Sequence, residues 1–272
     1  MSTKGVYSAL SGAMAQSLKL DTIANNLANV NTPGFKKDQQ LFQEYLTTYE
    51  KPTEVMPIPR DVAAIESFYN FQGGDKSFVD SKGTFTDFSQ GSLKKTGNPL
   101  DVGIDGKGFF EVATPQGVRL TRAGHFTLDG NGQLVTQQGY PVLKTAEPGA
   151  DPASRVINIG QGGGVSISDS GEVMQGDQVV AKLSLVDVAN PDSLQKIGTS
   201  LYGFKNNMAP QISILSNPSL KQGFMEGSNV NIVEEMTEMI KTQRVFESTQ
   251  KAISAYDSMA EKLVNVVGKT GQ

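Results

Sequence analysis

The side chains with the greatest catalytic potential are scarce in this sequence. His125 is the only histidine, and the chain of 272 residues contains no cysteine. A zinc site or a Ser–His–Asp triad that relies on imidazole therefore has one candidate and no partner histidine. His125 lies in an alternating, strand-like stretch, where a structural or surface histidine is expected. The 28 acidic residues show no spacing that singles out a pair for acid–base catalysis.

Three glycine-containing stretches resemble ligand-binding loops without meeting their requirements. Gly268-Lys269-Thr270 could end a phosphate loop, but such a loop also needs glycine five residues earlier, where this chain has Leu263. It also needs a strand before it, whereas the preceding element reads as a helix. Gly160–Gly164 leads into a strand pattern, so no helix N-terminus faces an anion. Asp129–Leu134 resembles a calcium loop but has leucine at the sixth position, where glycine is required. We therefore predict no catalytic residue, no cofactor and no metal ion.

Composition restricts the function classes further. Lys and Arg total 24 against 28 Asp and Glu, a net charge of −4, and only 19% of the residues are charged. Because no basic patch stands out, nucleic-acid binding is not expected. No apolar run approaches the ~20 residues of a transmembrane helix, and the N-terminus lacks the uninterrupted apolar core of a secretory signal peptide. Taken alone, these features indicate a cytoplasmic protein that is not an integral membrane protein.

Both ends of the chain carry apolar residues at seven-residue intervals. The N-terminal row comprises Val6, Ala13, Leu20 and Leu27. The C-terminal row comprises Ile232, Met239, Phe246, Ile253, Ala260 and Val267. Such rows are typical of helices that pack against helices in a coiled coil. A second C-terminal row, from Met236 through Gln243 and Gln250, is largely polar and favours a helix packed among several neighbours. The alternative is one amphipathic helix on its own β domain.

These patterns divide the chain into four segments. Residues 1–35 read as an N-terminal helix that Thr32-Pro33-Gly34 ends, because proline disfavours a helical residue before it. Residues 36–75 read as an extended connecting segment, and residues 76–224 as a β-rich domain with a turn about every ten residues. Residues 225–272 contain a C-terminal helix that Asn231 can cap. The expected fold class is α+β, with a central and mainly antiparallel β domain.

Three stretches carry a recognisable signature at both ends of the chain and in the first half of its middle. They are Ala24–Lys36; Thr96–Val102 with Gly106–Phe110 and Thr121–Gly124; and Glu226–Asn231 with Glu234–Met236. In this order they resemble the axial proteins of the bacterial flagellum, which include rod, hook and hook-associated proteins. The short middle and the Gly97–Asp101 variant of the motif resemble the basal-body rod proteins most, with a proximal rod protein favoured and a distal one as the alternative.

The resemblance implies a non-enzymatic structural protein. Its two terminal helices are expected to pair as a coiled-coil-like layer and to pack with other copies around an export channel, with the β domain outside. Such a chain would be a subunit of the rod, the drive shaft that crosses the periplasm. It would leave the cell through the flagellar type III export apparatus without a cleaved signal peptide. Its partners would be copies of itself, other rod proteins, a rod cap and that export apparatus.

The expected assembly interface lies on the helical rows and in the asparagine-rich end of the first helix. Its residues are Val6, Leu10, Ala13, Leu20, Ala24, Asn25, Asn26, Leu27, Asn29, Met236, Met239, Gln243, Phe246, Gln250, Ile253 and Ala260. The asparagine amides could bridge backbone groups of adjacent helices.

Two alternative functions stay open. One is a distal rod or hook-type axial protein. The other is a glycan-binding β domain on a coiled-coil tether, with Phe109, Phe110, Phe126 and Tyr140 as the candidate sugar-contacting aromatics.

Overall fold

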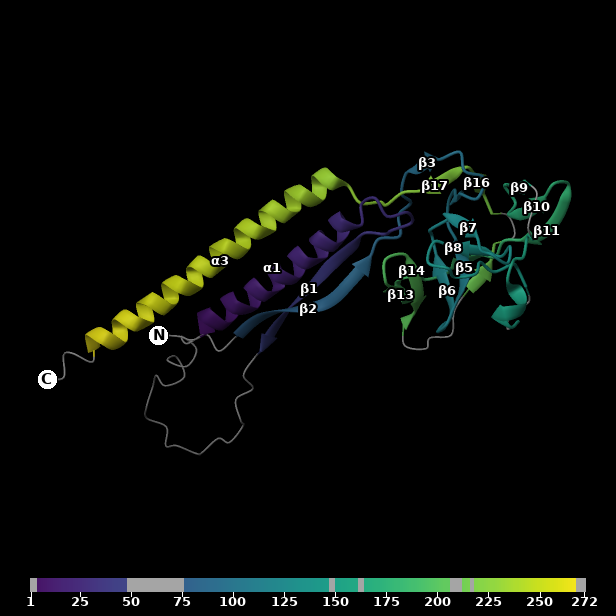
Figure 1. The fold of residues 1–272 in the computed structure, drawn as a ribbon. Coiled ribbons are helices and arrows are strands. Elements are labelled where there is room, and N and C mark those ends of the chain that lie inside the picture. Colours follow the sequence, from purple (N-terminus) through teal and green to yellow (C-terminus); the bar gives the residue numbers. More distant parts are fainter. Residues whose placement is uncertain are drawn as a thin grey trace, which may run out of the picture. The chain divides into compact units, whose positions relative to one another are not determined.

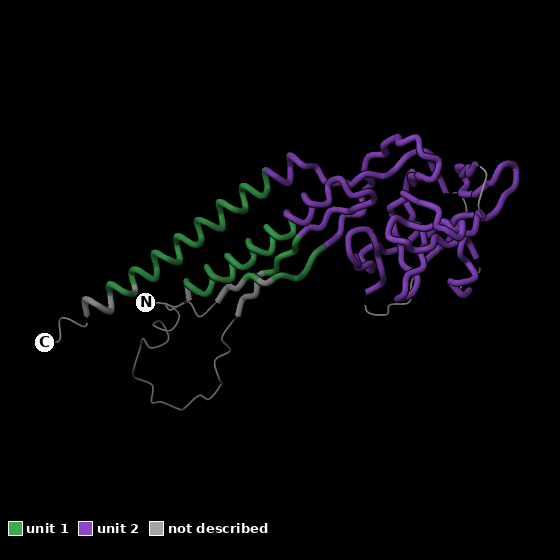
Figure 2. Tube along the Cα trace, viewed as in Figure 1, with its two compact units in different colours: residues 1–23, 40–84, 237–272 green, residues 24–39, 85–236 purple. Residues whose placement is uncertain are grey.

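The structure is a computed structural model that describes residues 4–47, 76–146, 150–160, 164–205, 212–215 and 218–267. The chain divides into two compact units, which are coloured separately in Figure 2. Unit 1 comprises residues 1–23, 40–84 and 237–272, and unit 2 comprises residues 24–39 and 85–236. Each unit is therefore assembled from segments that lie far apart in the sequence.

Unit 1 contains most of the two long helices and a two-stranded sheet. The elements are helix α1 (Lys4–Ala28), helix α3 (Ile232–Val267) and the paired strands β1 (Asp38–Thr47) and β2 (Lys76–Thr86). Within this unit α1 lies between α3 and the two strands (Figure 1). The Val79 amide of β2 donates a hydrogen bond to the Ser11 hydroxyl of α1 at 3.4 Å.

Small side chains allow α1 to approach its neighbours closely. Ala13 and Ala15 are only 6% and 5% exposed. The ammonium group of Lys19 lies 2.5 Å from the carboxylate of Glu238 on α3. This ion pair fixes which parts of the two helices lie at the same level in unit 1.

The two helices predicted at the ends of the chain are confirmed. Helix α1 ends at Ala28, before the predicted Thr32-Pro33-Gly34 stop. Helix α3 begins after Asn231, whose carboxamide oxygen accepts a hydrogen bond from the Val233 amide at 3.1 Å, as an N-cap does. Neither helix, over the residues described, combines the length and the hydropathy that crossing a membrane requires.

Unit 2 consists mainly of antiparallel strands. Its largest sheet has the order β13–β14–β6–β5–β12–β15. These strands span Leu194–Ile197, Leu201–Phe204, Gly117–Thr121, Phe109–Thr114, Leu185–Val188 and Ile212–Ile214. The coarse prediction of an α+β chain with a mainly antiparallel β domain is therefore confirmed.

Smaller sheets accompany the large one. A three-stranded sheet contains β11 (Gln178–Lys182), β10 (Glu172–Gln175) and β9 (Val165–Ile167). The two-stranded pairs are β16 (Leu220–Gln222) with β4 (Val102–Ile104), β17 (Phe224–Glu226) with β3 (Leu93–Lys95), and β7 (Phe126–Leu128) with β8 (Leu134–Thr136). Two short 3₁₀ helices span Pro152–Arg155 and Pro191–Ser193.

The six-stranded sheet buries side chains on both of its faces. Successive strand residues point to opposite faces, so Phe109 and Phe110 of β5 enter two different cores. Phe110 meets Phe126 edge to face, with ring centroids 5.2 Å apart. Phe109 meets Tyr202 in the same manner at 5.8 Å. Aromatic packing on both faces makes this sheet the rigid centre of unit 2.

The boundary between the connecting segment and the β domain differs from the sequence-based expectation. Residues 38–47 form strand β1, and residues 48–75 lie outside the described residues. Strand β2, which was expected to open the β-rich domain, pairs with β1 and lies largely in unit 1. No apolar alternation marks β1, because adjacent Leu41 and Phe42 are both exposed, at 48% and 38%.

Residues 181–188, within the predicted β-rich domain, are divided between two strands. Strand β11 ends at Lys182 and β12 begins at Leu185, in a different sheet. Between them, Ser184 is 1% exposed and its hydroxyl donates to the carboxylate of Glu111 at 2.6 Å. A stretch in which polar Lys182 and Ser184 alternate with apolar residues therefore contains a change of sheet.

Hydrogen exchange should distinguish the two units. Tyr256 and Met259 in the C-terminal half of α3 are 41% and 44% exposed. Little apolar burial there offsets an ordering cost of ~1–2 kcal/mol per residue. In dilute monomer we expect rapid exchange over residues 245–262 and the slowest exchange in β5, β6 and β12, measured by mass spectrometry. Equal protection of both regions in a proven monomer would contradict this expectation.

Candidate functional site

The chain leaves α1 through a turn that requires glycine. Gly34 has a φ of +66°, and a Cβ atom there would lie 2.4 Å from the Ala123 nitrogen and 2.5 Å from the Arg122 carbonyl carbon. The Gly34 amide donates to the Glu226 carbonyl oxygen at 2.9 Å. The helix has already ended at Ala28, and the turn at Gly34 brings the chain against two segments of unit 2.

Immediately after this turn the chain buries a lysine. Lys36 is 0% exposed, and its ammonium group donates to Glu226 Oε1 at 2.6 Å and to the Ser89 carbonyl oxygen at 2.7 Å. Glu226 is 1% exposed and also accepts from the Gly91 amide at 2.9 Å and from Arg122 Nη1 at 3.2 Å. One buried carboxylate therefore holds two buried cations.

Burial disfavours the charged form of each cation. Removal from water lowers the pKa of Lys36, and attraction to Glu226 opposes that change. The pKa of Arg122 is lowered by burial in the same way, again against the attraction of Glu226. The Arg122 guanidinium also lies 5.2 Å from the centroid of the Phe109 ring, which favours a cation. The charge balance of the site consequently depends on Glu226.

A second group of contacts joins the last turn of α1 to the first turn of α3. Asn26, 1% exposed, exchanges two hydrogen bonds with the Asp38 backbone at 2.9 and 3.0 Å and donates to Glu235 at 3.2 Å. Glu235, 3% exposed, pairs with the ammonium group of Lys37 at 2.6 Å. Burial lowers the pKa of Lys37, but the hydrogen bond to Glu235 and its charge together raise it above the usual value.

Lys196 connects the six-stranded sheet to the same segment. Its ammonium group lies 3.9 Å from the centroid of the Phe35 ring and donates to the Lys36 carbonyl and to Asp38 Oδ2, each at 2.7 Å. Burial lowers its pKa, and Asp38 opposes the change. We call these connected polar residues the junction cluster: Asn26, Lys36, Lys37, Asp38, Arg122, Lys196, Glu226 and Glu235.

The junction cluster is suited to holding chain segments together rather than to catalysis. Each of its charged side chains takes part in an ion pair with another member. A buried polar network whose members are paired restrains the segments that carry them. In the described part of the chain, no group of three or more His, Asp or Glu residues could hold a metal ion.

Apart from Asn26, the predicted interface residues in α1 and just after it fall into two groups, one buried or half-buried and one exposed. Ala13 is buried, and half-buried positions are Val6, Leu20, Leu27 and Asn29. The exposed positions are Leu10, Ala24 and Asn25. Asn26 differs from both groups: its amide bonds Asp38 and Glu235 of the same chain, where the sequence suggested a bridge to an adjacent helix.

The predicted positions on α3 divide in a similar manner. Half-buried side chains are Met239, Phe246 and Ile253, and exposed ones are Met236, Gln243 and Gln250. The side chain of Ala260 lies outside the described residues. The sequence analysis did not identify the charged residues Lys36, Glu226 and Glu235, although all three stand in or beside the matched stretches.

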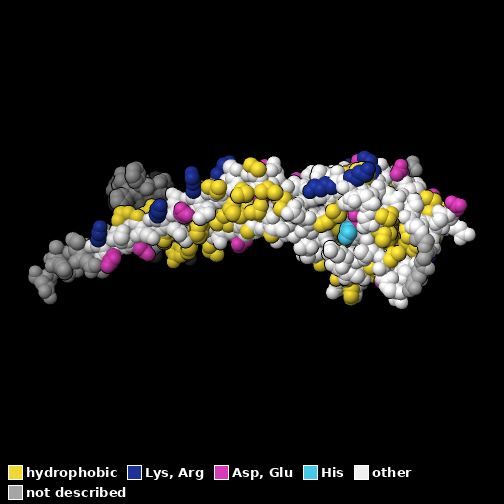
Figure 3. All heavy atoms as spheres, turned by 45° about the horizontal axis from the view of Figure 1, so that its top comes forward, with side chains coloured by type: hydrophobic (Ala, Val, Ile, Leu, Met, Phe, Trp, Pro, Cys, Tyr) yellow, Lys and Arg dark blue, Asp and Glu magenta, His cyan; other side chains and the backbone are white. Residues whose placement is uncertain are grey.

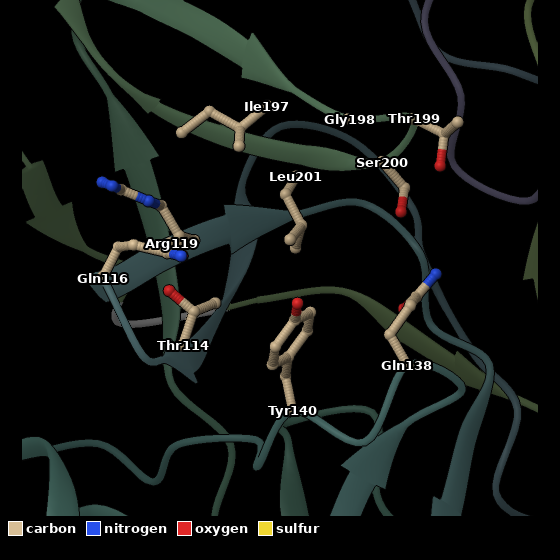
Figure 4. A pocket seen from close by; sticks show the side chains of 10 residues that line it. All are labelled: Thr114, Gln116, Arg119, Gln138, Tyr140, Ile197, Gly198, Thr199, Ser200 and Leu201. Atoms are coloured by element: carbon tan, nitrogen blue, oxygen red, sulfur yellow. The ribbon is translucent and has the colours of Figure 1, made fainter.

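The remaining candidates for chemistry occupy ordinary structural positions. Nδ1 of His125 lies 2.5 Å from Oδ1 of Asp101, within a short antiparallel bridge. An open pocket of about 340 Å³ is lined by Thr114, Gln116, Arg119, Gln138, Tyr140 and residues 197–201 (Figure 4). Of the four aromatics considered for sugar binding, Tyr140 lines this pocket, whereas Phe109, Phe110 and Phe126 are buried in the cores.

Replacing Glu226 tests the dependence of the fold on the junction cluster. Glu226→Gln preserves size but leaves the buried Lys36 and Arg122 without an anion, and removing one partner of a buried pair costs about 3–5 kcal/mol. Asp105→Asn is the control, because its pair with Lys221 is solvent-exposed and should leave stability nearly unchanged. Urea unfolding followed by circular dichroism measures both variants. Equal midpoints would show that the fold does not depend on the Glu226 charge.

Three family descriptions match this chain in the order of the segments described above. Residues 6–36 match the flagella basal body rod protein family, residues 103–175 the flagellar hook protein FlgE/F/G D1 domain, and residues 221–266 the flagellar basal body rod FlgEFG protein C-terminal family. The first match contains Asn26 and Lys36, and the last contains Glu226 and Glu235. The junction cluster therefore joins the two terminal family segments.

Named relatives align with nearly the whole chain. The chain is 38% identical over 275 residues to the flagellar basal-body rod protein FlgG of Bacillus subtilis, covering 97% of this chain and 98% of that protein. It is 36% identical over 259 residues to FlgG of Buchnera aphidicola subsp. Schizaphis graminum, with 93% and 95% covered. It is 33% identical over 264 residues to FlgF of Caulobacter vibrioides, with 97% and 98% covered. The chain belongs to the flagellar basal-body rod protein family, as the sequence resemblance indicated.

Proposed function

We propose that this chain is a structural subunit of the flagellar rod that polymerises through its terminal helices. Helices of neighbouring copies pack side by side as a coiled-coil-like layer and form the drive shaft and the wall of an export channel. The observation that carries this proposal is the set of apolar side chains that both helices leave exposed in the single chain.

The exposed apolar residues of α1 share one side of the helix. We call them the α1 face: Tyr7, Leu10, Met14 and Leu18, which are 59%, 47%, 63% and 44% exposed. Their spacing of three or four residues aligns them in a stripe. Apolar side chains are also seen gathered over the helices in Figure 3. A continuous apolar stripe on a water-exposed helix supports docking against a partner.

On α3 the two predicted rows have different surroundings. Met239, Phe246 and Ile253 are half-buried within the chain, whereas Gln243 and Gln250 are exposed. Amide side chains beside an apolar row favour packing in which hydrogen bonds set the register. This division supports a layer in which each α3 packs on its own α1 and also contacts helices of other copies.

The junction cluster supports a mechanical role. It ties the end of α1 and the start of α3 to the strands of unit 2 through buried ion pairs rather than through a single linker. Torque applied to the β domain would therefore reach the helices through several parallel connections. In this proposal the β domain lies outside the helical layer and adds lateral contacts.

The proposed surroundings follow from the same assignment. The named relatives are flagellar basal-body rod proteins, which supports the rod within the periplasm as the location. The partners are copies of the chain, other rod proteins, a rod cap and the flagellar type III export apparatus, and export proceeds without a cleaved signal peptide. The similarity to both FlgF and FlgG makes a distal rod position the second candidate.

A charge in the α1 face should block assembly without unfolding the monomer. Met14 is 63% exposed, so Met14→Asp should change stability by no more than about 0.5 kcal/mol. Docking would bury an unpaired carboxylate, and we therefore expect no incorporation into isolated basal bodies and no swimming. Val179→Asp, at a residue 60% exposed on β11, is the matched control and should assemble. If Met14→Asp is incorporated as well as the control, polymerisation does not use the α1 face.

His125→Gln separates a structural role from an enzymatic one. Glutamine retains a hydrogen-bonding group that can reach Asp101, so we expect a stability loss of ~1 kcal/mol at most and motility near that of the native protein. An enzyme that used this imidazole as a general base would lose at least ~10²-fold in rate. Swimming-plate assays and thermal unfolding measure the two effects. Lost motility with normal incorporation would assign His125 a separate task.

A further inference from the structure

We propose that the α1 face docks on the C-terminal half of α3 of a second copy, with the two helices antiparallel and in one defined register. The inference rests on the proposed polymerisation and names the partner of the α1 face. The receiving surface, which we call the α3 outer face, consists of Val245, Ser248, Ala252, Tyr256 and Met259, all of which are exposed. Its three large apolar members are 49%, 41% and 44% exposed.

The spacing of the two faces matches when the helices run in opposite directions. Along α1, successive members of the face are three, four and four residues apart. Backward along α3 from Met259, the same intervals reach Tyr256, Ala252 and Ser248. Antiparallel helices in contact need this kind of matched interval on both surfaces. The match extends over three helical turns.

The same register also places small side chains opposite two of the four members of the α1 face. Tyr7 meets Met259, Leu10 meets Tyr256, and Met14, the most exposed member of the α1 face, meets the small side chain of Ala252. Leu18 reaches Ser248, with Val245 one turn beyond. Large side chains opposite small ones allow the helices to interdigitate without overpacking.

Residues of opposite charge lie at the edge of the proposed contact, one on each helix. One turn beyond Leu18, the exposed residue Asp21 continues the α1 face. Lys241, whose side chain is 68% exposed, continues the α3 outer face at the corresponding end. In the proposed register the two opposite charges lie on facing sides, about one helical turn apart along the axis. Attraction between Asp21 and Lys241 is therefore compatible with this alignment.

The first turns of α3 provide a less suitable surface. Ile232, Val233, Met236 and Ile240 are also exposed, at 45%, 73%, 49% and 52%. If Tyr7 were placed opposite Ile240, Leu18 would come level with residue 229, which precedes the start of α3. The α1 face would then lose its last helical partner. The C-terminal half of α3 accommodates all four members.

The register displaces neighbouring copies along the helix axes. Within one chain, Lys19 is level with Glu238. In the proposed contact, Lys19 of one copy is level with residue 247 of the next, nine residues further along α3. At 1.5 Å per residue this displacement is roughly 13 Å. Because two different surfaces meet with an axial shift, repetition of the contact produces a helix rather than a closed ring.

Engineered cysteines can test the register directly, since the native chain contains no cysteine. Met14→Cys and Ala252→Cys are made as separate variants and are produced together in cells that lack the native protein. Basal bodies are isolated, oxidised briefly with copper phenanthroline and analysed on non-reducing gels. We expect a disulfide-linked dimer in the mixture and none with either variant alone. Leu10→Cys mixed with Tyr256→Cys should give the same result.

Other pairings would overturn the inference. A dimer from Met14→Cys alone would indicate contact between two α1 faces, and efficient linkage of Met14→Cys to Met236→Cys would indicate the first turns of α3. Concentrated purified mixtures are oxidised in parallel, so that a variant excluded from basal bodies is still examined. Absence of linkage in both settings, with the native chain present in basal bodies, overturns this register alone. Absence of the native chain from basal bodies overturns the proposed function.

Discussion

The buried carboxylate of Glu226 is the interaction on which the arrangement of unit 2 depends. It accepts hydrogen bonds from Lys36, Arg122 and the Gly91 amide, and its own carbonyl accepts from Gly34. A buried lysine and a buried arginine without a shared anion would be strongly unfavourable, so the three segments that supply them are constrained to meet. The segment that follows α1 is consequently fixed against β17 by both main-chain and side-chain bonds.

This constraint links parts of the chain that are remote in sequence. Lys36 and Glu226 are separated by 190 residues, and Asn26 and Glu235 by 209. Both pairs lie within unit 2, and the strands of the β domain stand between their members in the sequence. The end of α1 and the start of α3 are therefore positioned as a consequence of folding in unit 2.

The sequence predicted those features that arise from local periodicity or local turn chemistry. The helices at both ends follow from spacing, the turn at Gly34 from backbone restriction, and the start of α3 from the Asn231 cap. Strand β1 was missed because its apolar residues do not alternate with polar ones, and its pairing with β2 is decided by a distant segment. The junction cluster was missed for the same reason. A single sequence identifies a lysine beside Phe35 as a surface residue by default, and only tertiary contact explains why it is buried.

The free energy gained by burying the exposed helical faces limits how the proposed assembly can proceed. Full burial of an apolar side chain contributes about 1.5–3 kcal/mol, and the large members of both faces are already roughly half covered in the monomer. One contact between two copies therefore gains only several kcal/mol, comparable with the 4–15 kcal/mol that association costs in lost freedom. An isolated pair is weak on this estimate, whereas a copy that meets several neighbours at once is bound well. In the proposed assembly, faces of this size would therefore keep free chains apart and favour their addition at the end of an existing polymer.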